Sequence, residues 1–393
     1  MDKDKMMKIF LFKLLVLFLI VFQLVSCFDP IFYMVTVETP MLDPLIGGSP
    51  TNFTEYKNEL YIASGKKIFS YGKNIESGNN EWKTWIDLDA FVLNLASTGS
   101  SLYALYISED SGKIRRYYDN NDPSKSEDVD LPGNIQSIHA SDDYLFACAR
   151  DNDNNYTVYY RKEGDAGFSE ILMEKPDSKP LDYMLIGAAS DGIYLYLCAY
   201  SGIFYVEIVN IASSSALPLK DSEDKIITGF TGIINLNPNC IAAICHNGDL
   251  YEITNAAISE KTAAFEDSRY ATGALAIWKD KDDPTTPVLL LVGRNEDYYS
   301  TTSAYSNGYV EIELEASGNI KTDAKFKEPG KDAPTSIDDY DRYAPSLGKK
   351  LINYIIQTPA GIDVNMTMFA ATQQDGVWSY RDHGEGITWN SEQ

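Results

Sequence analysis

Scattered arginines of this sequence could hold an anionic substrate, among them Arg150, Arg294, Arg342 and Arg381. If several of them converged on one pocket, they could bind a substrate carboxylate, and a nearby pair of carboxyl groups could hydrolyse a glycosidic bond. However, Arg150 and Arg294 directly follow predicted strands, where an arginine more commonly forms a salt bridge at the rim. Spacing along the chain does not give the separation of carboxyl groups, so glycoside processing is the alternative hypothesis here.

Other residue types that support catalysis or cation binding are isolated from one another. His139, His246 and His383 lack the His-x-His or Glu-x-x-His spacing of metal sites. The run 151–155 resembles the start of a calcium loop, but Lys162 stands where a bidentate glutamate is needed, so we interpret the run as a solvated hairpin turn. There is no Gly-x-Ser-x-Gly motif for a nucleophilic serine. The sequence therefore predicts no cofactor, no metal site and no catalytic residue.

A polar insertion rich in tyrosine is the most suggestive candidate for a binding surface. It runs from Asn295 to Asn307 and carries Tyr298, Tyr299 and Tyr305 among serines and threonines. Tyrosine provides a large amphipathic contact area at a low entropic cost, and binding residues are concentrated on loops. We predict that these three tyrosines contact a partner. An ordinary polar insertion without a partner is the alternative.

The beginning of the chain has the organisation of an export signal. A short stretch with Lys3, Lys5 and Lys8 precedes an apolar run that ends in Leu-Val-Ser-Cys at residues 24–27. A charged segment followed by an apolar one is typical of secretory signals. The last four residues resemble the lipobox of bacterial lipoproteins, in which cleavage precedes a cysteine that is then acylated. The Phe- and Leu-rich signal is similar to those of spirochaete lipoproteins.

This resemblance implies that residues 1–26 are a lipoprotein signal peptide and that Cys27 carries the lipid, palmitate included. Residues 27–50 would then form a lipidated tether, and residues 51–393 the folded domain. The segment after Cys27 has no basic cluster, so acyl chains would be what holds the domain to a cell membrane or outer membrane, on its extracytoplasmic side. An ordinary signal peptide with a chance cysteine is the alternative.

The charge of the chain limits its partners. With 33 basic and 57 acidic residues, the net charge is −24. Such a surface repels nucleic acid and anionic headgroups, so we exclude polynucleotide binding. A neutral or basic partner, either protein or glycan, is expected.

Strand signals recur along the chain and indicate a repeat. Short apolar runs, each followed by a turn and a second strand rich in Tyr, Phe or Ile, begin at Leu60, Leu102, Leu145, Leu195, Ile241, Leu289 and Met368. The first six lie 42 to 50 residues apart, and two polar insertions, 295–307 and 325–350, lengthen the last interval. Another apolar segment precedes each pair and a weaker strand follows it. Four strands in a repeat of this length predict an all-β, seven-bladed β-propeller of four-stranded blades. A pair of β-sandwiches is the alternative.

The repeat also bears on the cysteines. Cys148, Cys198 and Cys245 fall near the end of the equivalent strand in three consecutive repeats, and Cys240 and Cys245 would point to opposite faces of one strand. Because a disulfide requires Cα atoms closer than about 7 Å, we predict free, buried thiols.

The last hairpin carries a further resemblance. Asp382, Gly384, Thr388 and Trp389 are similar to the turn of Asp-box propellers, with Tyr380 at the serine position. Taken together, the sequence favours a membrane-anchored, extracytoplasmic β-propeller lipoprotein that acts as a non-enzymatic binding or scaffold module. A degenerate, sialidase-like glycoside-processing propeller is the alternative.

Overall fold

The computed structural model describes residues 45–74, 77–174, 183–262, 265, 269–296, 308–327, 347, 350–382 and 387–392. They belong to one compact unit, Pro44–Glu392. Within them the regular structure is β-sheet, apart from the short 3-10 helix η1 (Ile208–Asn210). No helix in these ranges is long and apolar enough to cross a membrane. Cys27 and the predicted signal peptide lie outside the described residues.

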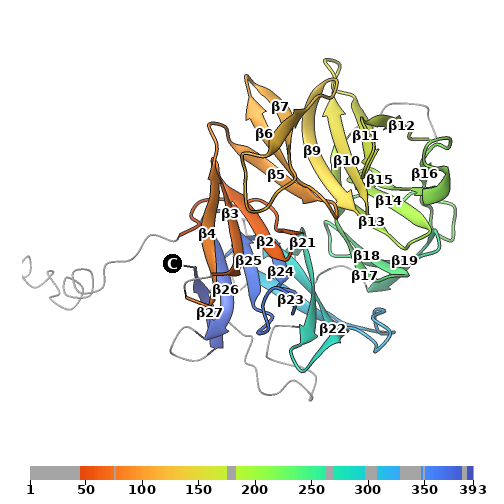
Figure 1. Cartoon of the computed structure of the whole chain (residues 1–393). Coiled ribbons are helices and arrows are strands. Elements are labelled where there is room, and N and C mark those ends of the chain that lie inside the picture. The colour runs from red at the N-terminus through yellow and green to blue at the C-terminus, as the bar shows by residue number, and fades with distance from the viewer. Residues whose placement is uncertain are drawn as a thin grey trace, which may run out of the picture. The chain divides into compact units, whose positions relative to one another are not determined.

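The strands form seven antiparallel sheets around a ring, here numbered blades 1 to 7, and within each sheet they pair in chain order (Figure 1). Blade 1 contains β1 (Thr54–Tyr56), β2 (Glu59–Ser64), β3 (Lys67–Lys73) and β4 (Asn80–Asp87). Blade 2 contains β5 (Val92–Ser97), β6 (Leu102–Ser108), β7 (Ser111–Tyr117) and β8 (Ser126–Val129). Blade 3 contains β9 (Asn134–Ser141), β10 (Tyr144–Arg150), β11 (Tyr156–Lys162) and β12 (Ser169–Ile171).

The second half of the ring continues the same pattern. Blade 4 contains β13 (Leu185–Ser190), β14 (Tyr194–Ala199), β15 (Gly202–Glu207) and β16 (Leu217–Pro218). Blade 5 contains β17 (Phe230–Asn237), β18 (Cys240–Cys245), β19 (Leu250–Thr254) and β20 (Ala257–Thr262). Blade 6 contains β21 (Arg269–Asp280), β22 (Asp283–Glu296) and β23 (Gly308–Glu313). Blade 7 contains β24 (Ile352–Gln357), β25 (Met368–Thr372), β26 (Val377–Asp382) and β27 (Ile387–Ser391).

Blade 6 departs from the predicted four strands. In the described part of the chain it has three, and isolated bridges between Glu311 and Lys327 and between Leu314 and Ile320 extend its outer edge. Two backbone hydrogen bonds of 2.9 Å form the bridge between Glu311 and Lys327.

Contacts between blades hold the ring together. In blades 1 to 5 and blade 7 the second strand is almost entirely buried, as expected for an apolar run covered on both faces. Within the described residues, seven clusters of buried apolar side chains each combine two adjacent blades. Since each blade buries its faces against both neighbours, stability comes from stacking around the ring. This confirms the propeller and rejects the sandwich.

The four cysteines of the described residues are free and buried, as predicted. Cys148, Cys198 and Cys245 lie on the second strands of blades 3, 4 and 5. Cys240 and Cys245, at the two ends of β18, contribute to different clusters. Burial raises the pKa of the Cys148 thiol to about 11, which keeps it protonated and unreactive.

Residues 45–48, which we call the clasp, complete the interface between blades 7 and 1. Ile46 is fully buried in the cluster shared by these blades. Its carbonyl oxygen accepts a hydrogen bond of 3.1 Å from the N–H of Val377, and two more backbone hydrogen bonds join the clasp to blade 7. The tether predicted for residues 27–50 therefore does not extend through the clasp, which is part of the propeller.

Candidate binding site

The innermost strands of the blades line a central channel and are bent near their beginning. In blades 2 to 7, the pairing of the first strand with the second shifts register within the first half of the first strand. An extra residue opposite one partner residue is a β-bulge, which bends the strand and redirects side chains. The repeated bulge gives the channel wall a common shape in these six blades.

Side-chain amides join neighbouring innermost strands across the blade interfaces. In three pairs, one amide bonds to both the N–H and the carbonyl oxygen of a single residue on the next strand: Asn52 with Leu95, Asn235 with Ser190, and Gln357 with Lys279. The Gln357 amide donates to the Lys279 carbonyl oxygen at 2.9 Å and accepts from the Lys279 N–H at 2.7 Å. Each amide thus replaces the hydrogen bonds of a neighbouring strand and fixes the channel wall.

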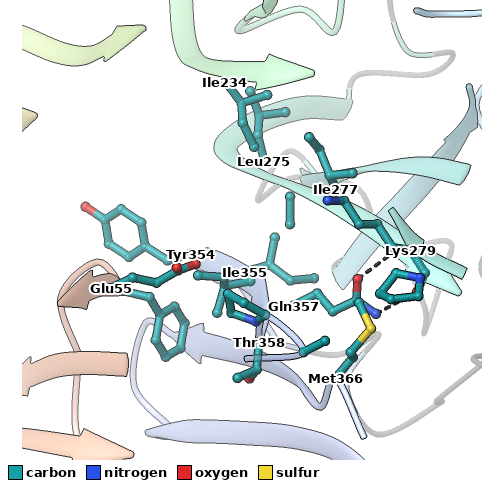
Figure 2. Close-up of a pocket in the computed structure, with 16 residues that line it drawn as sticks. Glu55, Ile234, Leu275, Ile277, Lys279, Tyr354, Ile355, Gln357, Thr358 and Met366 are labelled. Carbon is teal, nitrogen blue, oxygen red and sulfur yellow. Dashed lines mark hydrogen bonds between the residues drawn. The ribbon is translucent and has the colours of Figure 1, made fainter. Parts of the chain in front are cut away.

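Two cavities of the described part lie along the channel, and Phe53, Leu275, Tyr354 and Ile355 line both. One, of about 340 Å³, is lined by segments of all seven blades. The other, of about 450 Å³, lies among blades 1, 5, 6 and 7 (Figure 2). Both have the size of sites for small ligands.

The two ends of the ring differ in which parts of the strands lie there. We call the end at which the innermost strands begin the insertion face, and the end at which they turn into the second strands the turn face. The larger cavity lies toward the turn face, because the last residues of β1, β21 and β24 and the loop after β24 line it. We call it the turn-face cavity.

Two side chains of opposite charge line the turn-face cavity. Glu55 of β1 and Lys279 of β21 extend into it from opposite sides (Figure 2). Among the described residues, neither the Glu55 carboxylate nor the Lys279 ammonium forms a hydrogen bond or an ion pair. Burial raises the pKa of the Glu55 carboxyl above its ordinary value, and the positive charge of Lys279 opposes this rise. Two charges without partners among the described residues, in a cavity otherwise rich in apolar side chains, form a candidate binding site.

His139 lines the smaller cavity and has a structural role. Its Nε2 lies 3.0 Å from the carbonyl oxygen of Leu185 in blade 4, and the Ser137 hydroxyl donates to the same oxygen at 2.8 Å. Burial lowers the pKa of His139 to about 4. The imidazole is therefore neutral near pH 7, and its Nε2–H donates to this carbonyl, which joins blades 3 and 4.

The described arginines do not converge. Arg150 lies at the end of β10 beside its own hairpin, Arg294 is buried on β22, and Arg381 pairs with Glu392 at 2.8 Å. None of these three lines either cavity, and Arg342 lies outside the described residues. The arrangement that the glycoside-processing hypothesis required is thus not formed by the described arginines.

The remaining predicted features are local. His246 stacks on Tyr270 at 4.6 Å, and His383 lies outside the described residues. Asp151 accepts hydrogen bonds from the backbone N–H groups of two following residues, at 2.8 Å each, which confirms the solvated hairpin turn. No group of three or more metal-ligating side chains occurs in the described ranges. The Asp-box-like turn falls partly outside them.

The insertion face collects exposed aromatic and aliphatic side chains. In blade 2, Phe91 is 58% exposed and lies beside Leu93 and Ile107. In blade 4, Tyr183 packs on Tyr200 with ring centroids 5.2 Å apart, and both are more than two-fifths exposed. Each group sits where a first strand begins and a second strand ends. We call these five residues the aromatic patches.

The described residues that flank the tyrosine-rich insertion, Glu296 and Gly308, lie at the same end of the ring. The chain leaves the described part after β22 and returns at β23, and the end of β22 is at the insertion face. Tyr298, Tyr299 and Tyr305 themselves lie outside the described residues. The sequence did not reveal the aromatic patches, although each stands next to a predicted strand; only the common orientation of the blades brings them to one face.

Comparison with known proteins supports the fold. No protein-family model and no curated protein sequence matches the chain. A chain in a crystal structure of the mitotic checkpoint complex is 13% identical over 88% of this chain and 96% of its own length, with a TM-score of 0.55. YCF48 from Cyanidioschyzon merolae is 10% identical over 85% of this chain and 95% of its own length, with a TM-score of 0.51.

A third similar structure is the extracellular domain of the putative hybrid two component system BT4673 from B. thetaiotaomicron. It is 12% identical over 86% of this chain and 38% of its own length, with a TM-score of 0.50. At such low identity these likenesses show a β-propeller fold and nothing about activity.

Proposed function

We propose that the protein is a lipid-anchored, extracytoplasmic β-propeller lipoprotein of the bacterial envelope, which binds a protein or glycan partner through its insertion face without catalysing a reaction. The observation that carries this proposal is the gathering of the aromatic patches at the face from which the tyrosine-rich insertion leaves the ring. Exposed aromatic side chains grouped on one face are typical of binding surfaces.

Different observations support the lipid anchor and the extracytoplasmic location. The lipobox-like residues 24–27 make Cys27 the site of acylation. One structural neighbour is an extracellular domain, which agrees with a location outside the cytoplasm. The net charge of −24 favours a neutral or basic partner.

Metabolic labelling with palmitate in a bacterial host tests the anchor. The full chain should take up the label and remain with the membrane fraction after a high-salt wash. The Cys27→Ser variant should do neither. If the Cys27→Ser variant is labelled and retained like the wild type, Cys27 is not the anchor.

A comparison of variants tests the insertion face. We expect envelope components captured by the immobilised chain 28–393 to be lost when Tyr183 and Tyr200 are replaced by alanine, and when residues 297–306 are shortened. The matched control replaces Ile193 and Val364, which are 54% and 79% exposed in turns at the opposite face. Capture that survives both insertion-face changes, or that is lost equally in the control, contradicts the proposal.

A further inference from the structure

The turn-face cavity has features that the proposed function does not use. Its walls are largely apolar, with Ile234, Leu275, Ile277 and Met366 among them, yet Glu55 and Lys279 bring one negative and one positive charge into it. Glu55 is exposed and Lys279 is partly buried, so both charges are accessible to a ligand that enters from solvent. These two have no partner among the described residues and are not within the 4.0 Å of an ion pair with each other.

The backbone around both charges is fixed. Lys279 lies on β21, and the Gln357 amide holds both its N–H and its carbonyl oxygen. Glu55 lies on β1, and its carbonyl oxygen accepts a hydrogen bond from the Ser97 hydroxyl of blade 2. Trp278 and Tyr56, the neighbours of the two charged residues, are buried in blade clusters. Because side chains alternate along a strand, Glu55 and Lys279 are directed toward the channel.

We propose that the turn-face cavity binds a short zwitterionic peptide of two or three residues with apolar side chains. Glu55 receives its terminal ammonium, Lys279 receives its terminal carboxylate, and the apolar wall holds its side chains. An extended chain spans about 3.3 to 3.6 Å per residue, so such a peptide can reach two charges that are too far apart to pair directly. The cavity of about 450 Å³ has room for it.

The charges distinguish this ligand from other small molecules. A simple anion would find Lys279 but would face Glu55, within a chain of net charge −24. A simple cation would face Lys279 for the same reason. A neutral ligand would leave both charges unpaired while removing them from water, which is unfavourable. A molecule with opposite charges at its two ends matches both sites.

Calorimetric titration of the chain 28–393, which contains all seven blade clusters, tests this proposal. The probes are Leu-Leu, N-acetyl-Leu-Leu, which lacks the ammonium, and Leu-Leu amide, which lacks the carboxylate. We expect Leu-Leu to bind with a stoichiometry of one, and each blocked peptide to bind roughly tenfold or more weakly, since each loses one charge-assisted contact.

Two variants assign the charges to the ends of the peptide. In Glu55→Gln, Leu-Leu and N-acetyl-Leu-Leu should bind equally, because the site no longer distinguishes the ammonium. In Lys279→Met, Leu-Leu and Leu-Leu amide should bind equally. Glu109→Gln and Lys113→Met, in an exposed hairpin of blade 2, are the matched controls and should keep the wild-type preference.

The wild-type series decides the proposal even if a variant fails to fold. The proposal is overturned if Leu-Leu does not bind at millimolar concentration, or if the three peptides bind the wild type equally. It is also overturned if the folded Glu55→Gln variant retains the preference for a free ammonium. Because the aromatic patches are at the other face, failure here leaves the proposed function intact.

Discussion

Replacing Ile46 with alanine tests whether the clasp is part of the propeller. Ile46 is fully buried between blades 7 and 1, and the change removes three carbon atoms from that cluster. At about 0.8 kcal/mol per buried CH₂, the loss of transfer free energy alone is about 2 to 3 kcal/mol. The cavity left behind adds to it, so we expect the free energy of unfolding to fall by about 3 kcal/mol, within the range known for such changes.

Urea unfolding of the chain 28–393 measures this effect. Tryptophan fluorescence is a suitable signal, because Trp82 belongs to the same cluster as Ile46. Leu45→Ala is the control: this neighbouring side chain is 44% exposed, and its loss should change stability by less than about 0.5 kcal/mol. If Ile46→Ala is no more destabilising than Leu45→Ala, residues 45–48 belong to the tether as the sequence suggested, and our account of ring closure is wrong.

Two further substitutions test the channel wall. Asn52→Asp replaces the group that donates to the Leu95 carbonyl oxygen with an acceptor. In urea unfolding at pH 7, the variant should therefore be about 1 to 3 kcal/mol less stable than the wild type. At pH 4 the introduced carboxyl group can be protonated and donate, so the difference in stability should be smaller. Equal deficits at both pH values would contradict this. The pKa of His139 is lowered to about 4 in the folded chain. As pH falls, the unfolded chain therefore binds a proton at this residue before the folded chain does. Its stabilising contribution is present above about pH 6.5 and is lost toward pH 4. Relative to a non-titrating His139→Gln variant, which can still donate to Leu185, the wild type should lose up to about 3 kcal/mol of stability between pH 7.5 and 4. A difference between the two proteins that does not change with pH would refute the neutral assignment.

The sequence predicted the parts of the fold that have a local signal. The second strands, such as those beginning at Leu60 and Leu102, are apolar runs buried on both faces, so their recurrence was enough to predict the blades and their number. The clasp has no such signal. Leu45 and Ile46 are only a pair of apolar residues in a short segment rich in Pro and Gly, and Val377, the partner of Ile46, belongs to the last blade. Only closure of the ring brings the two together.

The candidate site was harder to predict for a related reason. Glu55 and Lys279 each stand in a strand of mixed composition, where a charged residue is typical of a solvated position. Their significance comes from the geometry of the channel, which directs both into one cavity from blades that are far apart in the sequence. The arginines are the converse case: Arg150 has the residue type of a binding site, but it follows a strand, and it lies at a hairpin as that position predicted.

The two faces of the ring separate two kinds of recognition. The insertion face presents exposed aromatic side chains that suit a large partner, whereas the turn-face cavity holds two charges and suits a small ligand. The fixed innermost strands lie between them, joined across blades by side-chain amides such as that of Asn52. A rigid wall of this kind has no evident second arrangement, and coupling between sites requires an element with two states. We therefore expect the two surfaces to act independently: shortening residues 297–306 should leave the affinity for Leu-Leu unchanged, and Glu55→Gln should leave partner capture unchanged.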